Sequence, residues 1–309
     1  MFIGVGRLAY RTMDDIKNIL GNNPKVKPLK SFTKRYMNRR LKPEKRKPCV
    51  DLILTENGKK YKVLKSDDKN NSQLNSILRL KDTFLSLNFV PRIVWSNENA
   101  IVADYIDGVF ADFGDLEFAK QFGKNLAILH QINVGTTDKK EYLEKIFKCL
   151  EFIYSKSVIS EQLKNKCYNK IISRQPDELR TSMTYSNMHN EENFVVDKNN
   201  KLWFIDFGSF KEVRVTDDAL FGYKLFKSID KKTFWKSYFE SGGPKYLIEN
   251  EMFLKITQLI RKGALHLEKY YKLSNLNMRT KRHRLKRTRW MVNELVNEID
   301  RNLNSTEIK

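Results

Sequence analysis

Residues 193–208 read NFVVDKNNKLWFIDFG, and this stretch decides the predicted fold. Two apolar segments, 194–196 and 202–205, flank a polar turn, which is the pattern of a β-hairpin. Asn193 and Asp206 then stand at the open end of the hairpin, thirteen residues apart in sequence. Amide and carboxylate oxygens are ligands that magnesium accepts. We therefore predict that Asn193 and Asp206 hold a magnesium ion at this end of the hairpin.

Hydrophobic periodicity predicts two differently built halves on either side of Gly108. The expected elements of the first half, in chain order, are strands over 50–55 and 60–65 with a turn at Asn57-Gly58, a helix over 72–87, and strands over 92–95 and 100–106. After Gly108 the apolar residues recur mostly at helical spacing, and helices are expected to follow the hairpin to the end of the chain. The prediction is an α+β protein with a small β-rich N-lobe and a larger helical C-lobe.

The chain resembles the kinase-like fold shared by aminoglycoside phosphotransferases and lipopolysaccharide core kinases. The pattern of that family is His-Gly-Asp, four residues, Asn, an apolar strand, a turn and Ile-Asp-Phe-Gly. Its second part matches Asn193 and the sequence Asp206-Phe207-Gly208. The resemblance spans roughly residues 50–230 and implies a bilobal protein-kinase-like fold that uses ATP and Mg²⁺. It also implies that Asn193 and Asp206 are the metal ligands and that Asp206 is a catalytic residue.

Four further segments match the family in the expected order. Residues 61–65 resemble the strand that carries the phosphate-binding lysine, which would be Lys65. Residues 103–108 resemble the hinge between the lobes, where backbone groups of Asp104 and Ile106 would bind adenine. The remaining two matches are residues 88–94, which resemble the strand after the first helix, and residues 122–130, which resemble the Gly-x-x-Leu-Ala-x-Leu-His helix.

The catalytic loop departs from the family pattern. Counting back five residues from Asn193 reaches Met188, and one inserted residue puts Asn187 where the family has its catalytic aspartate. Neither side chain can take a proton as a carboxylate does. Asn187 is therefore the expected occupant of the catalytic position. Phosphoryl transfer depends mainly on positioning and charge stabilisation, so both a divergent enzyme and a pseudokinase remain open.

Two more parts of the pattern are missing from the expected N-lobe. No Gly-rich phosphate loop precedes Lys65 in the first hairpin. The helix over 72–87 offers Gln73 or Asn75 where the family carries a glutamate to pair with the lysine.

The net charge of +21 is concentrated in two segments. Residues 25–47 hold 11 basic residues against Glu44 alone, and residues 279–289 hold seven basic residues and no acidic one. Such clusters suit an anionic partner: nucleic acid, an anionic lipid surface or a phosphorylated substrate. A solvated basic surface is the alternative explanation. The candidate polyanion-binding residues are Arg282, Arg284, Lys286 and Arg287, which precede an apolar helix expected to begin at Met291.

These observations together give one leading functional hypothesis and two alternatives. The leading hypothesis is an ATP-dependent phosphotransferase that acts on an anionic glycan or a lipid-linked sugar, as the resemblance to lipopolysaccharide core kinases implies. The first alternative is a catalytically impaired kinase-like module that binds nucleic acid or another polyanion. The second is a small-molecule or protein kinase whose charge is incidental.

Composition limits the setting in which the chain works. No apolar run approaches the roughly 18 residues of a membrane span, and three widely spaced cysteines predict neither a disulfide framework nor a zinc site. We expect a cytoplasmic protein, either free or peripheral at the inner face of a membrane. The expected organisation is a basic N-terminal extension over 1–48, an N-lobe over 49–107 and a C-lobe over 108–309.

Overall fold

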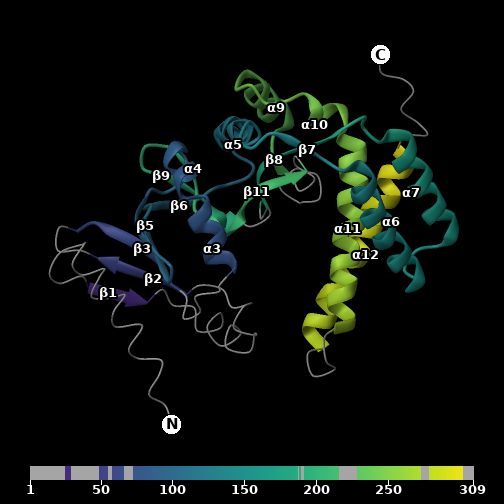
Figure 1. Cartoon of the computed structure of the whole chain (residues 1–309), viewed down its shortest axis with the longest axis horizontal. Helices are drawn as coiled ribbons and strands as arrows, with labels where there is room; N and C mark the ends of the chain where they lie inside the picture. Colours follow the sequence, from purple (N-terminus) through teal and green to yellow (C-terminus); the bar gives the residue numbers. More distant parts are fainter. Residues whose placement is uncertain are drawn as a thin grey trace, which may run out of the picture. The chain divides into compact units, whose positions relative to one another are not determined.

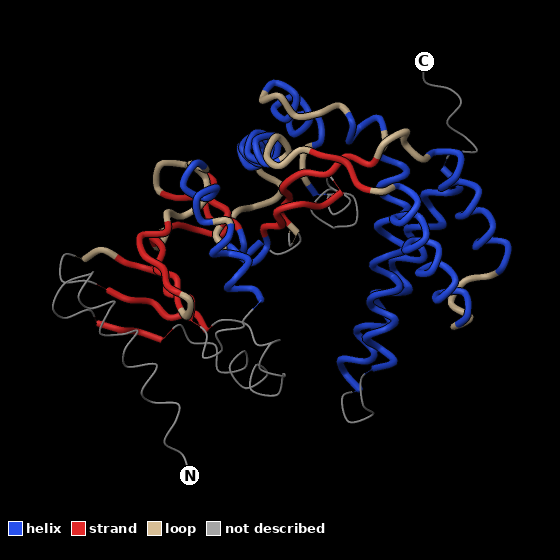
Figure 2. The backbone as a smooth tube through the Cα atoms, in the orientation of Figure 1, coloured by secondary structure: helices blue, strands red, loops and turns tan. Residues whose placement is uncertain are grey.

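The computed structural model describes residues 25–28, 49–54, 58–65, 72–186, 188, 191–215, 228–272 and 278–301. The chain divides into two compact units (Figure 1). The first unit combines residues 1–112 with 190–210, and the second combines 113–189 with 211–309. Strands dominate the first unit and helices the second, as Figure 2 shows by colour.

An antiparallel five-stranded sheet forms the centre of the first unit. Its strands are β1 (Lys25–Pro28), β2 (Cys49–Leu54), β3 (Lys60–Lys65), β4 (Ile93–Asn97) and β5 (Ala100–Asp104), in the spatial order β1-β2-β3-β5-β4. The β4–β5 turn is closed by the Asn97 side chain, whose Oδ1 accepts hydrogen bonds from the N–H groups of Asn99 and Ala100. Four residues of β5, Ala100 to Ala103, are fully buried, so this strand is the core of the sheet.

Strand β1 lies within residues 1–48, which we expected to form a basic N-terminal extension. Lys25–Pro28 pairs with Asp51–Leu54 in an antiparallel register and adds an edge strand to the sheet. Edge strands are often rich in lysine and proline, which hinder pairing with other chains. The other residues of the predicted extension lie outside the described ranges.

The helix expected over 72–87 is two helices in the structure. α3 covers Ser72–Arg79 and α4 covers Lys81–Ser86, and the chain turns at Leu80 between them. Phe84 of α4 packs against Phe207 and Phe210, with ring centroids 5.3 and 4.9 Å apart. The short second helix therefore binds the hairpin region to the first sheet.

The predicted hairpin is confirmed and is part of a three-stranded sheet in the first unit. β9 (Phe194–Asp197) lies between β10 (Leu202–Phe204) and β6 (Gly108–Phe110). Phe204 packs edge-on against Phe194 and Phe89, and its N–H donates to the Phe89 carbonyl. These contacts explain why residues 190–210 group with the first unit, although we had expected them within the C-lobe.

The second unit consists of seven helices and a small sheet within the described ranges. The helices are α5 (Leu116–Leu129), α6 (Lys139–Ser155), α7 (Glu161–Arg174), α9 (Lys231–Glu240), α10 (Tyr246–Glu249), α11 (Glu251–Lys272) and α12 (Met278–Arg301). Side-chain N-caps fix the starts of α5, α6, α7 and α9, where Asp115, Asp138, Ser160 and Asp230 accept from backbone N–H groups. The sheet has the order β11-β8-β7, with β7 (Gly135–Thr137), β8 (Leu179–Tyr185) and β11 (Phe210–Val215).

Helices α11 and α12 form a long antiparallel pair (Figure 1). α12 begins at Met278, so the basic segment 279–289 is helical and continuous with the apolar part that we expected to start at Met291. A buried ion pair between Lys255 and Glu298 joins the far ends of the two helices. No helix in the described ranges has a stretch long and apolar enough to cross a membrane.

Candidate nucleotide and metal site

The hairpin brings the backbones of Asn193 and the Asp206 segment together, as predicted. Three residue pairs, from Phe194–Phe204 to Val196–Leu202, form the β9–β10 ladder. Beyond it, the Ile205 N–H donates to the Asn193 carbonyl at 3.0 Å. The ladder thus extends to the residue immediately before Asp206. Asn193 is buried and Asp206 is half-buried.

The Asp206 carboxylate is held by the residues that follow it. Its Oδ1 accepts from the Gly208 N–H at 3.1 Å, and its Oδ2 accepts from the Ser209 hydroxyl at 2.6 Å. Asp206 is therefore the N-cap of the single 3₁₀ turn over Phe207–Ser209. Each carboxylate oxygen has two acceptor positions, so both oxygens keep capacity for a cation. Ser209 is fully buried, which fixes the carboxylate in one orientation.

Lys62 reaches this end of the hairpin. Its Nζ donates to the Ile205 carbonyl at 2.8 Å, although the two residues are 143 positions apart. The bond places an ammonium group one residue from Asp206. Sequence analysis missed Lys62 because the family match pointed to the end of the strand rather than to its middle.

Lys65 lies on the opposite face of β3. The register of β3 with β2 and β5 is regular from Lys60 to Lys65, so residues of odd and even number face opposite sides of the sheet. Lys65 shares its face with Tyr61 and Val63, which pack in a cluster with Val102. The alternation of side chains between the two faces of a strand was the sequence signal that could have distinguished Lys62 from Lys65. The phosphate-binding role of Lys65 stays a prediction.

Gln73 is the residue of α3 that meets the Asp-Phe-Gly segment. A Cβ atom added at Gly208 would lie 1.7 Å from Gln73 Nε2, so the amide sits directly over the glycine. Asn75, the other candidate, is exposed. Of the two residues offered by the sequence, Gln73 thus lies where the helix approaches Asp206. Its neutral amide can exchange hydrogen bonds but cannot form the ion pair of a glutamate.

The predicted hinge follows directly from β5. The Asp104 N–H donates to the Arg92 carbonyl at 2.9 Å, so any adenine contact at Asp104 falls to its carbonyl oxygen. Ile106 has no hydrogen-bond partner among the described residues, and it is half-buried. The adenine-binding role of both residues stays a prediction.

An ion pair and a backbone hydrogen bond hold the two residues on either side of Ile106. Lys60 Nζ lies 2.6 Å from Asp107 Oδ1, and this hydrogen bond raises the pKa of Lys60. The N–H of Tyr105 donates to the Lys60 carbonyl, so one strand residue holds both neighbours of Ile106.

The catalytic loop is described only in part. Asn187, the predicted occupant of the catalytic position, lies outside the described residues. Met188, the residue reached by strict counting, is completely buried and packs in the core of the second unit. Residues 179–190, which read LRTSMTYSNMHN, contain no carboxylate, and the nearest preceding one is Glu178.

The predicted polyanion-binding residues all lie on α12 but differ in exposure. Arg282, Lys286 and Arg287 are exposed. Arg284 is half-buried, and its Nη1 lies 3.0 Å from His266 Nδ1 on α11.

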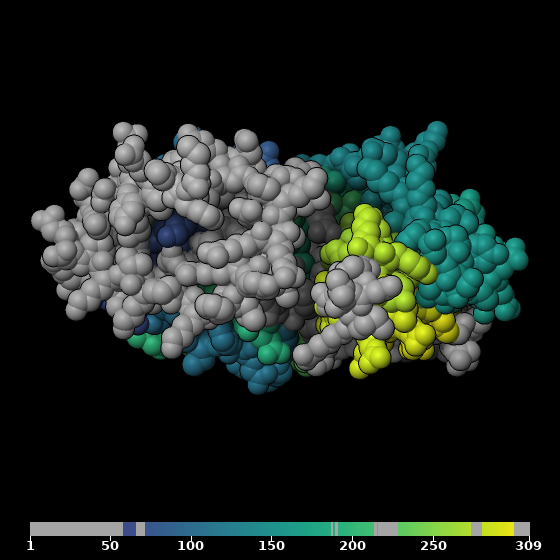
Figure 3. All heavy atoms as spheres, turned by 90° about the horizontal axis from the view of Figure 1, so that it is seen from below, coloured from purple at the N-terminus to yellow at the C-terminus, as the bar shows by residue number. Residues whose placement is uncertain are grey.

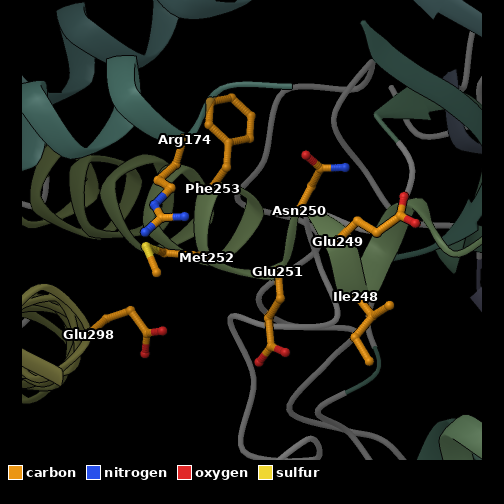
Figure 4. A pocket seen from close by; sticks show the side chains of 8 residues that line it. All are labelled: Arg174, Ile248, Glu249, Asn250, Glu251, Met252, Phe253 and Glu298. Atoms are coloured by element: carbon orange, nitrogen blue, oxygen red, sulfur yellow. The ribbon is translucent and has the colours of Figure 1, made fainter. Parts of the chain in front are cut away.

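A cavity of about 350 Å³ lies in the second unit, and none of the predicted site residues lines it (Figure 4). Its lining comes from α7, α10, α11 and α12 and consists of Arg174, Ile248, Glu249, Asn250, Glu251, Met252, Phe253 and Glu298. The Glu298 carboxylate is engaged by Lys255. The lining is predominantly acidic, because it contains three glutamates and one basic residue, Arg174.

Comparisons with known proteins identify the fold but no sequence family. No protein-family model and no curated protein matches the sequence. Among solved structures, macrolide 2'-phosphotransferase MphH from Brachybacterium faecium matches 90% of this chain and 97% of its own, with 12% identity and a TM-score of 0.62. Choline kinase from Cryptosporidium parvum Iowa II matches 96% and 98%, with 12% identity and a TM-score of 0.59.

A third similar structure is described as a ternary complex of streptomycin, ATP and APH(2")-IIa. It covers 94% of this chain and 99% of its own, with 13% identity and a TM-score of 0.54. At identities this low, the likeness concerns the fold. The chain has the kinase-like fold found in aminoglycoside and macrolide phosphotransferases and in choline kinase, in a divergent form.

Proposed function

We propose that the protein is an ATP- and Mg²⁺-dependent phosphotransferase. The observation that carries the proposal is the convergence of Lys62, Asn193 and Asp206 at the open end of the β9–β10 hairpin. Two hydrogen bonds define it, from Lys62 Nζ to the Ile205 carbonyl and from the Ile205 N–H to the Asn193 carbonyl. The fold supports the same activity, since a similar chain is described in complex with ATP.

The residues present fit a magnesium ion. A carboxylate and an amide oxygen are hard donors of the type that Mg²⁺ prefers, and Mg²⁺ is usually bound by one or two carboxylates together with substrate phosphates. When bound, the ion neutralises charge on the phosphates during transfer. Ser209 orients the Asp206 carboxylate, and Lys62 supplies a positive charge beside it.

The acceptor that we propose is an anionic glycan or a lipid-linked sugar. The net charge of +21 supports this choice, because a basic surface attracts an anionic substrate or a membrane that carries it. A phosphotransferase with a small-molecule or protein acceptor is the alternative within the same reaction class.

A nucleotide-binding module without catalysis is the second candidate function. The observation that favours it is the sequence of residues 181–190, which contains no carboxylate to act as a base. Loss of a general base lowers a rate by roughly 10²–10⁴-fold. A slow enzyme and an inactive module therefore differ in turnover and not in nucleotide binding.

The first test separates nucleotide binding from folding. Asp206→Ala should abolish Mg²⁺-dependent ATP binding in isothermal titration, because it removes the charged metal ligand. Asp82→Ala is the matched control, since Asp82 is an exposed carboxylate of the same unit. Equal binding of ATP by both variants would contradict the proposed site.

The second test concerns turnover. If the protein is a divergent enzyme, Asn187→Asp should increase ATP turnover measured against a panel of anionic glycans, since it restores a proton acceptor. A parent and a variant that both bind ATP and both fail to turn it over would favour the non-catalytic module.

A further inference from the structure

Basic side chains from helices α11 and α12 come together in one cluster, to which each helix contributes a part. His266 on α11 lies 3.0 Å from the guanidinium of Arg284 on α12. Arg284, Lys269, Arg287 and Lys262 all act on the imidazole, and all four are positively charged. We call these four residues with His266 the hairpin cation cluster. Lys262 and Lys269 belong to α11, which the sequence had not connected with the basic segment.

The α12 residues of the hairpin cation cluster, Arg284 and Arg287, lie in a segment without acidic residues. Between Met278 and Arg289 the sequence of α12 contains no Asp or Glu. On the facing part of α11, Glu268 forms an ion pair with Lys272 one helical turn away. Burial and the surrounding cations lower the pKa of His266 to about 4, and burial together with Arg284 lowers the pKa of Lys269. Four positively charged side chains therefore act on the His266 imidazole in addition to its burial.

An exposed row of basic side chains continues the cluster along α12. Arg282, Lys286, Arg287 and Arg289 are exposed, and the spacing of 282, 286 and 289 places three of them on one side of the helix. At 1.5 Å per residue, that row is about 10 Å long. Figure 3 shows the α11–α12 surface exposed beside the teal helices α6 and α7 of the same unit.

The chemistry of the row favours phosphate groups presented by a polymer. Residues 279–289 contain five arginines and two lysines, and arginine binds phosphate through paired N–H donors. Tyr270 adds an aromatic ring beside the row, with Lys281 Nζ 5.3 Å from its centre. Helices that insert into a membrane surface present large apolar side chains next to the basic ones. None of the described side chains of α12 is an exposed large apolar one, and α11 exposes two, Leu265 and Tyr271.

We propose that the α11–α12 hairpin is a binding site for the phosphate backbone of nucleic acid, formed by the hairpin cation cluster and the exposed row Arg282, Lys286, Arg287 and Arg289. The site is independent of the proposed phosphotransfer, since it uses none of the residues around Asp206. Contacts to phosphate give affinity without sequence specificity. Binding of RNA by the full chain is therefore expected to be insensitive to sequence and steeply dependent on salt.

A charge-reversal variant with a matched control tests the location. The variant changes Arg282, Lys286, Arg287 and Arg289 to Glu and leaves the half-buried Arg284 in place. The control changes Lys140, Lys148, Lys232 and Lys245 to Glu, which are exposed residues of the same unit and alter the net charge equally. The variant should bind a single-stranded RNA at least about tenfold more weakly, with a salt slope smaller by about 3. Both proteins should retain Mg²⁺-dependent ATP binding.

Comparison with phosphatidylserine vesicles separates nucleic acid from membrane. If the parent binds the vesicles and not the RNA, the surface is a membrane site and the proposal is overturned. If the variant and the control bind RNA equally well, the basic face is merely solvated and the proposal is also overturned.

Histidine resonances give a readout at the site itself. Phosphates close to Arg284 and Arg287 should offset the positive charges that act on His266, so RNA should raise the pKa of His266 above its value of about 4. Labelled histidine spectra of the full chain, recorded over a pH series with and without RNA, measure this shift. An unchanged His266 pKa in RNA-saturated protein would place the RNA elsewhere and overturn the proposal.

Discussion

At the residue scale, the side chains around Asp206 make its carboxylate a structural group as well as a candidate ligand. Ser209 is fully buried and donates to Asp206 at 2.6 Å. A hydrogen bond to a charged group contributes about 1.5–3 kcal/mol. Ser209→Ala should therefore lower the free energy of unfolding by about that amount. Ser86→Ala, which removes an exposed hydroxyl bonded to the Thr83 carbonyl, should change it by less than about 0.5 kcal/mol in the same denaturant titration.

Removing the side chains of Lys62 and Lys65 should weaken nucleotide binding to different extents. Because Lys62 Nζ lies next to the Asp206 segment, Lys62→Ala should weaken ATP binding by about 10–100-fold, the value of one charged hydrogen bond. Lys65→Ala should have the smaller effect, since that residue faces the other side of β3. Isothermal titration measures the ATP affinity of both variants. A larger loss of affinity in Lys65→Ala would favour Lys65 as the phosphate-binding lysine, as predicted from the sequence.

At the element scale, two buried helix glycines differ in what surrounds them. A Cβ at Gly123 of α5 would meet the Phe234 carbonyl of α9 at 2.5 Å, whereas a Cβ at Gly263 of α11 would meet only side-chain atoms, the Ile153 methyl at 3.4 Å and Met291 Cβ at 4.0 Å. Gly123→Ala should destabilise the protein by about 1–3 kcal/mol, because a backbone has to move. Gly263→Ala should be neutral or stabilise by up to about 1 kcal/mol, because alanine favours the helix. Chemical denaturation measures the free energy of unfolding of the two variants. Similar changes in both would contradict this account of α5–α9 packing.

The elements that the sequence predicted are those with strong periodicity or a turn signal. The β9–β10 hairpin, the β2–β3 pair and α5 all have such patterns. The sequence missed β8, because Thr181, Ser182 and Thr184 are small polar residues that are nonetheless buried, and it missed the three-residue β7 altogether. The expectation that only helices follow the hairpin was wrong for β11. For the candidate site, sequence spacing was enough to place Asn193 and Asp206 at the same end of the hairpin, but only the three-dimensional register could distinguish Lys62 from Lys65.

At the scale of the whole molecule, the burial of His266 within the hairpin cation cluster should make stability depend on pH. The pKa of His266 is lowered from 6.5 to about 4 in the fold, so the unfolded chain binds the extra proton between these values. Stability from this group is complete above pH 6.5 and is lost as the pH falls towards 4. The loss is at most about 3 kcal/mol, and solvent screening makes it smaller. Thermal unfolding from pH 7 to 4 measures it, and His266→Gln should flatten the curve.

The grouping of residues 190–210 with the first unit has a consequence for synthesis on the ribosome. The five strands of the first sheet have all been made once residue 104 is complete, but Phe204, which covers Phe89, follows about a hundred residues later. At about 5–20 residues per second, the growing chain waits roughly 5–20 s for that cover. During this interval Phe89 lacks its aromatic cover and is accessible to chaperones near the exit tunnel. Truncation after residue 112 would make the same gap permanent, so the first unit cannot be produced as a contiguous N-terminal fragment.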